Sequence, residues 1–187
     1  MHQLTDSQTK LLTALTKVVS QASDFNTTLA VALSQICEAT DWDYGEVWIP
    51  EKDGTILKLS PVRCVSTQDS GNVLALEQFQ ECSKAFILDQ GEGLPGRVWS
   101  SRQPEWIVDV SVESETYFLR NKIAKAFGVK AGLGVPILVD AQVQAVFVFF
   151  MLEACAKDDG LLELTQAVAT QLGQMLPSID KELNHQP

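Results

Sequence analysis

Two apolar segments separated by a two-residue turn constrain the fold of this chain more than any other feature. Residues 132–139 and 142–152 are both of strand length, and only Asp140 and Ala141 stand between them. Strands joined by so short a connection pair antiparallel. The longest uninterrupted apolar run, 145–152, is far shorter than the ~18 residues of a membrane-spanning helix. The chain is therefore expected to build an antiparallel sheet and not to enter a membrane.

The other elements follow from apolar periodicity and turn residues. The pattern predicts a helix over 6–22, a second helix from Asp24, strands over 44–49 and 56–65, a helix over 75–85, a short helix over 97–101, a strand over 104–108, a helix over 113–127, and, after the strand pair above, a final helix over 158–180. Strands joined by tight turns, with helices at both chain ends, are typical of an α+β fold with one antiparallel sheet. We divide the chain into an N-terminal helix (1–23), a domain (24–180) and a tail (181–187).

The two terminal helices are long and amphipathic. If their apolar stripes exceed the area that the sheet can cover, a second copy of the chain would pair with them, which predicts a homodimer. The alternative is that these stripes pack only within one chain. The residues assigned to the dimer helices are Leu12, Leu15, Val19, Leu164, Val168 and Leu172.

The charge balance limits the possible partners. The formal net charge is −10, whereas phosphate binding requires clustered Lys and Arg, so nucleic acid is not expected as a partner. The first ten residues are polar and lack the apolar run of a signal peptide, which predicts a cytoplasmic protein or the cytoplasmic part of a larger one. The most basic stretch is interpreted as the solvated face of a helix, with an anion contact as the alternative; it comprises Arg120, Lys122, Lys125 and Lys130.

The positions of histidine and cysteine limit the chemistry. His2 and His185 are the only histidines, and both stand at the ends of the chain, outside any predicted core. Cys64 and Cys82 could approach each other across the sheet, although no histidine or lysine neighbours either thiol in the sequence. The cysteines form no CxxC pair and are expected to be free, buried thiols; they are Cys37, Cys64, Cys82 and Cys155.

Acidic residues form three groups in the sequence, and none of these groups is expected to bind a metal ion. Each group is explained by a turn, by a solvated helix start or by a helix cap. The groups are Asp41 and Asp43; Asp109, Glu113 and Glu115; and Asp158 and Asp159. Walker, dinucleotide-binding and serine-triad signatures are absent, so no catalytic residue is predicted.

A glycine-rich loop carries the most specific motif. Gly93 and Gly96 permit a tight backbone turn, and Pro95 suits the first turn of the helix that follows. The chain resembles a GAF domain over roughly residues 24–177, and is most similar to those of bacterial, especially cyanobacterial, signalling proteins. The segments that carry the resemblance are DWDYGEVWIP (41–50), GEGLPGRVWSSRQPEWIVDV (91–110), FGVKAGLGVPIL (127–138) and VFVFFML (146–152).

The resemblance implies a GAF-like sheet with the N- and C-terminal helices on one face and a ligand-pocket layer of loops and helices on the other. It implies regulatory sensing of a small molecule, whose identity is open, with output passed to another domain or to a partner kinase. The alternatives are a ligand-free dimerisation or scaffold module and a thiol-dependent methionine sulfoxide reductase using Cys64 and Cys82. The expected pocket residues are Trp48, Leu94, Trp99, Trp106, Tyr117, Phe118, Phe127 and Leu133.

Two cofactors found in GAF domains are not expected. Where the resemblance would place the Cys-His pair that binds a bilin covalently, this chain has Leu119 and Arg120. Haem ligated by histidine is excluded by the terminal positions of both histidines. A cyclic-nucleotide signature is only partly present, because Asn121-Lys122 is not followed by an Asp-Glu pair. Ala145 replaces a glycine common in the family and implies a narrower pocket.

Overall fold

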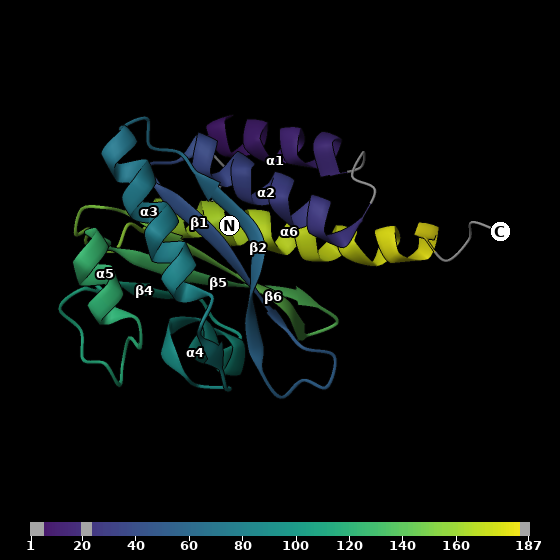
Figure 1. The fold of residues 1–187 in the computed structure, drawn as a ribbon. Helices are drawn as coiled ribbons and strands as arrows, with labels where there is room; N and C mark the ends of the chain where they lie inside the picture. The colour runs from purple at the N-terminus through teal and green to yellow at the C-terminus, as the bar shows by residue number, and fades with distance from the viewer. Residues whose placement is uncertain (1–5, 20–23, 184–187) are drawn as a thin grey trace.

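Six antiparallel strands form a single sheet in the order β3-β2-β1-β6-β5-β4 (Figure 1). The computed structural model describes residues 6–19 and 24–183. The strands are β1 (Tyr44–Pro50), β2 (Leu57–Val65), β3 (Ile87–Leu88), β4 (Glu105–Ile107), β5 (Gly132–Val139) and β6 (Gln142–Phe150). The central pair is β1 and β6, so the strand with the longest apolar run lies in the middle of the sheet.

The β5–β6 hairpin has the tight connection that the sequence predicted. Asp140 and Ala141 are both left-handed, with φ of 48° and 61°. This is the geometry of a type I′ turn, whose twist matches that of the flanking strands. Val139 pairs with Gln142 directly across the turn. A left-handed alanine costs about 1 kcal/mol, which the long pairing of the two strands offsets.

Three helices cover one face of the sheet: α1 (Asp6–Val19), α2 (Phe25–Ala39) and α6 (Asp159–Leu183). α2 begins as predicted, because the Asp24 side chain accepts a hydrogen bond from the Thr27 backbone N–H at 2.9 Å. Gly173 lets α6 lie directly on β5, since a Cβ there would stand 2.1 Å from the Leu138 carbonyl oxygen. The largest buried side chains of this layer are Leu29, Leu33, Ile36, Trp42, Phe147, Phe149 and Leu172.

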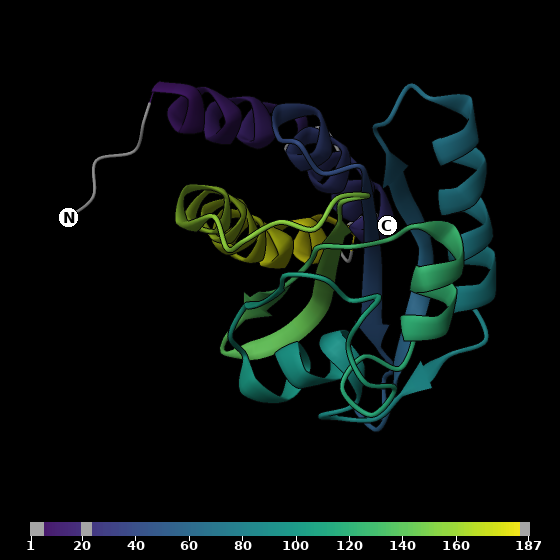
Figure 2. The same cartoon turned by 90° about the vertical axis from the view of Figure 1, so that its left-hand side faces the viewer.

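The opposite face is covered by α3 (Ser70–Ser83), α4 (Gly93–Ser101) and α5 (Asn121–Phe127). Figure 2 shows α1 and α6 on one side of the sheet and α3 and α5 on the other. Side chains alternate along β1, so Val47 joins the first core while Tyr44 and Trp48 join the second. The two-sided arrangement and the α+β class that the resemblance implied are therefore confirmed.

The segment before α5 differs from its prediction. Of the helix predicted over 113–127, only Asn121–Phe127 is helical. In the preceding turns, the backbone N–H groups of Tyr117 and Phe118 both donate to the Ser114 carbonyl, at 3.0 and 2.8 Å. The Ser114 hydroxyl also accepts from the Tyr117 N–H at 3.2 Å. Such local side-chain bonds compete with a helix, so residues 112–120 form a connecting segment instead.

Two smaller differences concern α3 and β3. α3 begins at Ser70, before its predicted start at 75, because Asp69 caps it by accepting from the Asn72 backbone N–H at 2.9 Å. β3 was not predicted, since two residues are too few to show alternation. Its Leu88 pairs with Leu57 of β2.

Two of the six residues assigned to a dimer interface are fully buried within a single chain. Val168 and Leu172 are fully buried between α6 and the sheet, and their assignment to a dimer interface is therefore wrong. Leu12 and Leu164 are partly buried against the same core. The side chains of Leu15 and Val19 lie outside the described residues. Dimerisation itself stays a prediction, as does the assignment of Leu12, Leu15, Val19 and Leu164 to its interface.

The structure also bears on two further predictions, the absence of a membrane-spanning helix and the C-terminal tail. Within residues 6–19 and 24–183, no helix is long and apolar enough to cross a membrane. α6 continues to Leu183, so the first part of the predicted tail 181–187 is helical and the remainder lies outside the described residues.

Candidate functional site

A buried ion pair joins the centre of the sheet to the start of α5. Arg120 Nη2 donates to Glu46 Oε1 at 2.6 Å, and Arg120 Nη1 donates to Glu46 Oε2 at 3.2 Å. The Glu46 side chain is 0% exposed and that of Arg120 is 3% exposed. Removing two charges from water costs several kcal/mol per ion, which mutual attraction offsets only with excellent geometry. The presence of the pair is therefore weak evidence that it stabilises the fold.

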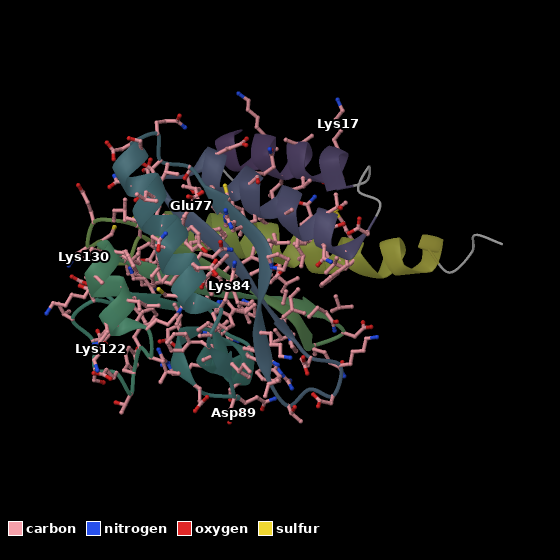
Figure 3. All side chains as sticks on the ribbon, in the orientation of Figure 1. Lys17, Glu77, Lys84, Asp89, Lys122 and Lys130 are labelled. Atoms are coloured by element: carbon pink, nitrogen blue, oxygen red, sulfur yellow. The ribbon has the colours of Figure 1, made fainter. Side chains whose placement is uncertain are left out.

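β1 and the residue before α5 position the two charges. Glu46 points toward the α3–α5 layer because side chains alternate along β1, and a register shift in the β1–β2 pairing follows it. The Arg120 carbonyl accepts from the Ala124 backbone N–H at 2.8 Å, which starts α5. The guanidinium turns inward, so the prediction that Arg120 lies on a solvated basic face is wrong. The predicted position on a solvated face is confirmed for Lys122, which is exposed at the outer edge of α5 (Figure 3).

Four aromatic rings surround the guanidinium. Its central carbon lies 5.0 Å from the ring centroid of Phe79, 5.2 Å from Trp48, 5.3 Å from Phe150 and 5.5 Å from Phe118. Ring faces attract a cation, more strongly where water is excluded. Trp48 Nε1 also donates to Glu46 Oε1 at 2.8 Å. The rings therefore hold the cation while the indole N–H helps to hold the carboxylate.

Ser83 and Tyr44 add polar groups to the pair. Arg120 Nη1 donates to Ser83 Oγ at 2.9 Å, and this hydroxyl donates to the Phe79 carbonyl at 2.7 Å. The Tyr44 hydroxyl is buried on the same face. Burial, and to a lesser extent the Glu46 carboxylate, raise the pKa of Tyr44 well above 10. Tyr44 therefore stays neutral.

Gln80 on α3 supplies a buried donor. Its side chain is 2% exposed, and Nε2 has no hydrogen-bond partner among the described residues. Its Oε1 accepts from Arg63, the residue that faces Glu46 across the β1–β2 pair. Leaving a buried donor unpaired costs about 1–3 kcal/mol. The layer around Glu46 therefore holds both a costly ion pair and an unused donor.

Arg120 also lines a small hollow beneath α4. The hollow has no room for a molecule the size of water. Pockets that hold small organic ligands measure ~300–1,000 Å³, so the site is closed in this structure. Its walls are formed by Leu88, Gly93, Leu94, Pro95, Phe118, Leu119 and Arg120.

A second ion pair holds the segment 112–120 that closes this hollow. Arg97 Nε and Nη2 donate to the Glu105 carboxylate at 3.0 and 2.6 Å. Arg97 Nη1 donates to the Tyr117 carbonyl at 2.5 Å, and the guanidinium lies 3.9 Å from the centroid of the Tyr117 ring. The Tyr117 hydroxyl donates to Glu105 at 2.9 Å; partial burial, and then this bond, raise its pKa. We call Arg97, Glu105 and Tyr117 the latch.

Most of the predicted pocket residues lie on this face of the sheet. Leu94 and Phe118 line the hollow, and Trp48 contacts the ion pair. Trp99 belongs to the same buried core, and Phe127 packs against it while partly exposed. Tyr117, the remaining member on this face, is 39% exposed and belongs to the latch.

Trp106 and Leu133 do not belong to the pocket, and their assignment to it is wrong. They pair across β4 and β5, and both side chains join the core under α2 and α6. Trp106 packs 5.2 Å from Trp42 between ring centroids, and its Nε1 donates to the Cys155 carbonyl at 3.0 Å. Ala145 faces the same core, so its methyl group does not narrow the pocket as expected.

The sequence pattern did not identify Glu46. One signal was available, because a carboxylate at an inward position of an apolar strand needs a buried partner. Nothing local points to Arg120 as that partner, since 74 positions separate the two residues. Only the folded chain brings them together.

The cysteines lie away from the hollow. Cys64 packs on the α2 side of the sheet, while Cys82 is exposed on α3, on the other side. The expectation that these two thiols approach each other is therefore wrong, as is the burial expected for Cys82. The neighbour of Cys64 is instead Cys37, which is buried on α2.

The acidic residues act as turn and cap residues. Asp43 Oδ2 accepts from the Leu152 backbone N–H at 2.8 Å, and Asp158 Oδ1 accepts from the Leu161 backbone N–H at 2.9 Å at the start of α6. Among the side chains that the structure describes, no group of three or more His, Cys, Asp or Glu residues could hold a metal ion.

Sequence comparison identifies a family and relatives. Residues 22–176 match the family model described as GAF domain. Protein NLP2 of Arabidopsis thaliana is 26% identical to this chain over 166 residues, which cover 81% of this chain and 17% of the plant protein. The chain thus spans less than a fifth of this relative.

Solved structures share the fold. The GAF domain of a phosphoenolpyruvate-protein phosphotransferase from Coxiella burnetii superposes with a TM-score of 0.72 at 18% identity, covering 96% of this chain and 99% of that one. The free methionine-R-sulfoxide reductase of Neisseria meningitidis, solved in complex with its substrate, gives a TM-score of 0.71 at 14% identity and covers 97% of both chains. The likeness to bacterial and cyanobacterial signalling proteins stays a prediction, but the family is established: this chain belongs to the GAF domain family.

Proposed function

We propose that this chain is a regulatory GAF domain that senses a small polar molecule at the hollow beside Arg120. The observation that carries the proposal is the fully buried Glu46–Arg120 pair, whose arginine lines that hollow. Apolar side chains of similar volume would serve stability as well or better. We therefore assign the pair to ligand recognition, a role consistent with membership of the GAF family.

The charges define the chemistry of the ligand. An anionic group would accept hydrogen bonds from the Arg120 guanidinium, which favours carboxylates and small oxyanions. A ligand that also carries an ammonium group would bind Glu46 and so replace both partners of the pair. Small carboxylates, free amino acids and oxyanions are thus the first compounds to test.

Opening of the latch would admit the ligand. Its Arg97–Glu105 pair is about one quarter exposed, with side-chain exposures of 22% and 24%, so water can compete for both charges. Release would free residues 112–120 and, through Arg120, the start of α5. A ligand shifts such an equilibrium only when it binds one arrangement better. The signal would pass to another domain or a partner kinase, with a homodimer as the expected assembly.

A regulatory role is favoured over catalysis at this hollow. A reductase needs a thiol there, and no cysteine belongs to the described residues that line it. We therefore propose no catalytic residue for this site. A ligand-free scaffold module remains the alternative, and it would leave the buried charges without a role.

A thermal unfolding screen tests the proposal. The panel consists of free methionine sulfoxide, other amino acids, small carboxylates and inorganic oxyanions, each added to the purified chain. At least one compound is expected to raise the midpoint by several degrees, because ligand binding stabilises the folded state. The rise should vanish in Glu46→Gln/Arg120→Gln, which removes the charges but retains hydrogen-bonding groups.

A matched control removes a surface pair instead. Glu115→Gln/Lys122→Gln deletes an exposed ion pair near the same segment and should leave the ligand-induced shift intact. If no compound stabilises the wild type, or if the shift survives in the Glu46/Arg120 variant, the proposed function is wrong.

A further inference from the structure

Two cysteines lie on the opposite face of the sheet, where α2 packs against β1 and β2. Cys64 on β2 is the cross-strand partner of Gly45 on β1. Cys37 on α2 lies directly above the same glycine, since a Cβ at Gly45 would stand 3.0 Å from Cys37 Sγ. The missing side chain at Gly45 lets α2 approach the strands closely. The two thiols therefore meet over one position of the sheet.

The two thiols influence each other's ionisation. The neighbouring Cys37 thiol, and to a lesser extent Ser34, favour the thiolate of Cys64 and lower its pKa to about 7, although burial opposes them. The Cys64 sulfur, followed by burial, raises the pKa of Cys37. Cys64 is thus the thiol that ionises first, and Cys37 is the protonated neighbour beside it.

Solvent reaches Cys64 through a groove of about 890 Å³ at this end of the sheet. Both cysteines line the groove, together with residues of the α2–β1 connection and of the chain after β6. Cys64 is partly exposed, whereas Cys37 is 1% exposed. A small reagent that enters the groove would therefore meet Cys64 first.

We propose that Cys64 and Cys37 form a peroxide-reactive dithiol that closes to a disulfide between β2 and α2. This site is separate from the hollow beside Arg120, because it lies on the other face of the sheet. It would give the domain a redox input that is independent of ligand binding.

The chemistry needs only hydrogen peroxide as oxidant. The Cys64 thiolate attacks one peroxide oxygen, the O–O bond breaks, and the departing hydroxide takes up a proton to become water. Cys64 is then a sulfenic acid. The Cys37 sulfur attacks the Cys64 sulfur, the S–O bond breaks, and the hydroxyl leaves as water with the Cys37 proton. Two thiols are oxidised to one disulfide, and one peroxide is reduced to two waters.

Mass spectrometry of the wild-type chain tests the proposal. The protein is treated with equimolar hydrogen peroxide, the remaining thiols are blocked with N-ethylmaleimide under denaturing conditions, and the peptides are mapped without reduction. The expected product has Cys37 and Cys64 linked and unblocked, Cys82 and Cys155 blocked, and full recovery of thiols after dithiothreitol. A product in which Cys37 stays blocked, or in which Cys64 is linked only between chains, overturns the proposal.

Two variants separate the roles of the thiols. In Cys37→Ala, Cys64 should stop at the sulfenic acid, which dimedone traps, and its oxidation should slow severalfold because the neighbouring thiol that lowers its pKa is gone. In Cys82→Ser, a change at an exposed cysteine on the other face, the disulfide should form at the wild-type rate. Equal rates for the wild type and Cys37→Ala contradict the influence of Cys37 on Cys64. None of these outcomes depends on the ligand site.

Discussion

Arg120 and Glu46 lie 74 positions apart in the sequence, yet they share two hydrogen bonds in a layer that excludes solvent from both side chains. The pair links the central strand β1 to the start of α5. It therefore connects the middle of the sheet with the segment 112–120 that closes the hollow. A substitution of either residue is therefore expected to disturb the position of the other.

Replacing both charges is expected to leave stability intact. In Glu46→Leu/Arg120→Met, the free energy of unfolding should equal that of the wild type or exceed it by about 1–4 kcal/mol, because the desolvation cost disappears. Urea unfolding followed by circular dichroism measures this. Arg120→Met alone should lose about 3–5 kcal/mol, since it leaves Glu46 charged and buried. A double variant less stable than the wild type by more than about 2 kcal/mol would show that the pair serves the fold.

Breaking the latch should free the segment over the hollow. Arg97→Met removes the Glu105 pair and the bond to the Tyr117 carbonyl. We expect a loss of about 1 kcal/mol, because the pair is partly solvated, and faster amide hydrogen exchange confined to residues 112–120. Glu81→Gln, which breaks the exposed pair with Lys84, should leave this exchange unchanged. Unaltered exchange in Arg97→Met would argue against the latch.

The reactivity of Cys64 should titrate near neutral pH. The thiolate is the reactive form, so the rate of alkylation by iodoacetamide should rise with pH through a midpoint near the lowered pKa of about 7. Cys37 and Ser34 lower this pKa, while burial, and to a lesser extent the Glu38 carboxylate, oppose them. Peptide-resolved mass spectrometry follows Cys64 alone. In Cys37→Ala the midpoint should move up toward the ordinary value of about 8.5; an unmoved midpoint would contradict the influence of Cys37 on Cys64.

A methyl group at Gly173 should separate α6 from the sheet. Gly173→Ala would place its Cβ 2.1 Å from the Leu138 carbonyl oxygen, so the helix must shift. A loss of about 1–3 kcal/mol is expected from such overpacking, measured by urea unfolding. Gly160→Ala, in the first turn of the same helix, meets only the Asp158 side chain at 3.4 Å and should be tolerated. Equal stabilities for the two variants would refute the close approach.

The fold was predictable because its signals are local. The two-residue turn at Asp140 and Ala141 determined the β5–β6 hairpin, and Asp24 marked where α2 begins. Where local signals compete, the prediction was wrong. Residues 113–120 have helical spacing, but the hydroxyl of Ser114 and the guanidinium of Arg97 bind their backbone groups instead.

The site was less predictable because it depends on which face each side chain takes and on long-range pairing. Trp99 and Trp106 are close in sequence, yet they lie on opposite faces of the sheet. Cys64 and Cys82 are separated in the same way, and the true neighbour of Cys64 comes from α2. Aromatic composition indicated the layer that holds the hollow, but it could not reveal the charges within it.

Isothermal titration calorimetry measures ligand binding at the Glu46–Arg120 pair. The panel compound that most raises the unfolding midpoint is titrated into the wild-type chain and into Glu46→Gln/Arg120→Gln. We expect saturable heat with one site per chain in the wild type and none in the variant. Equal heat in both proteins, or no saturable heat from any small carboxylate, amino acid or oxyanion, would contradict the assignment of the Glu46–Arg120 pair to ligand recognition.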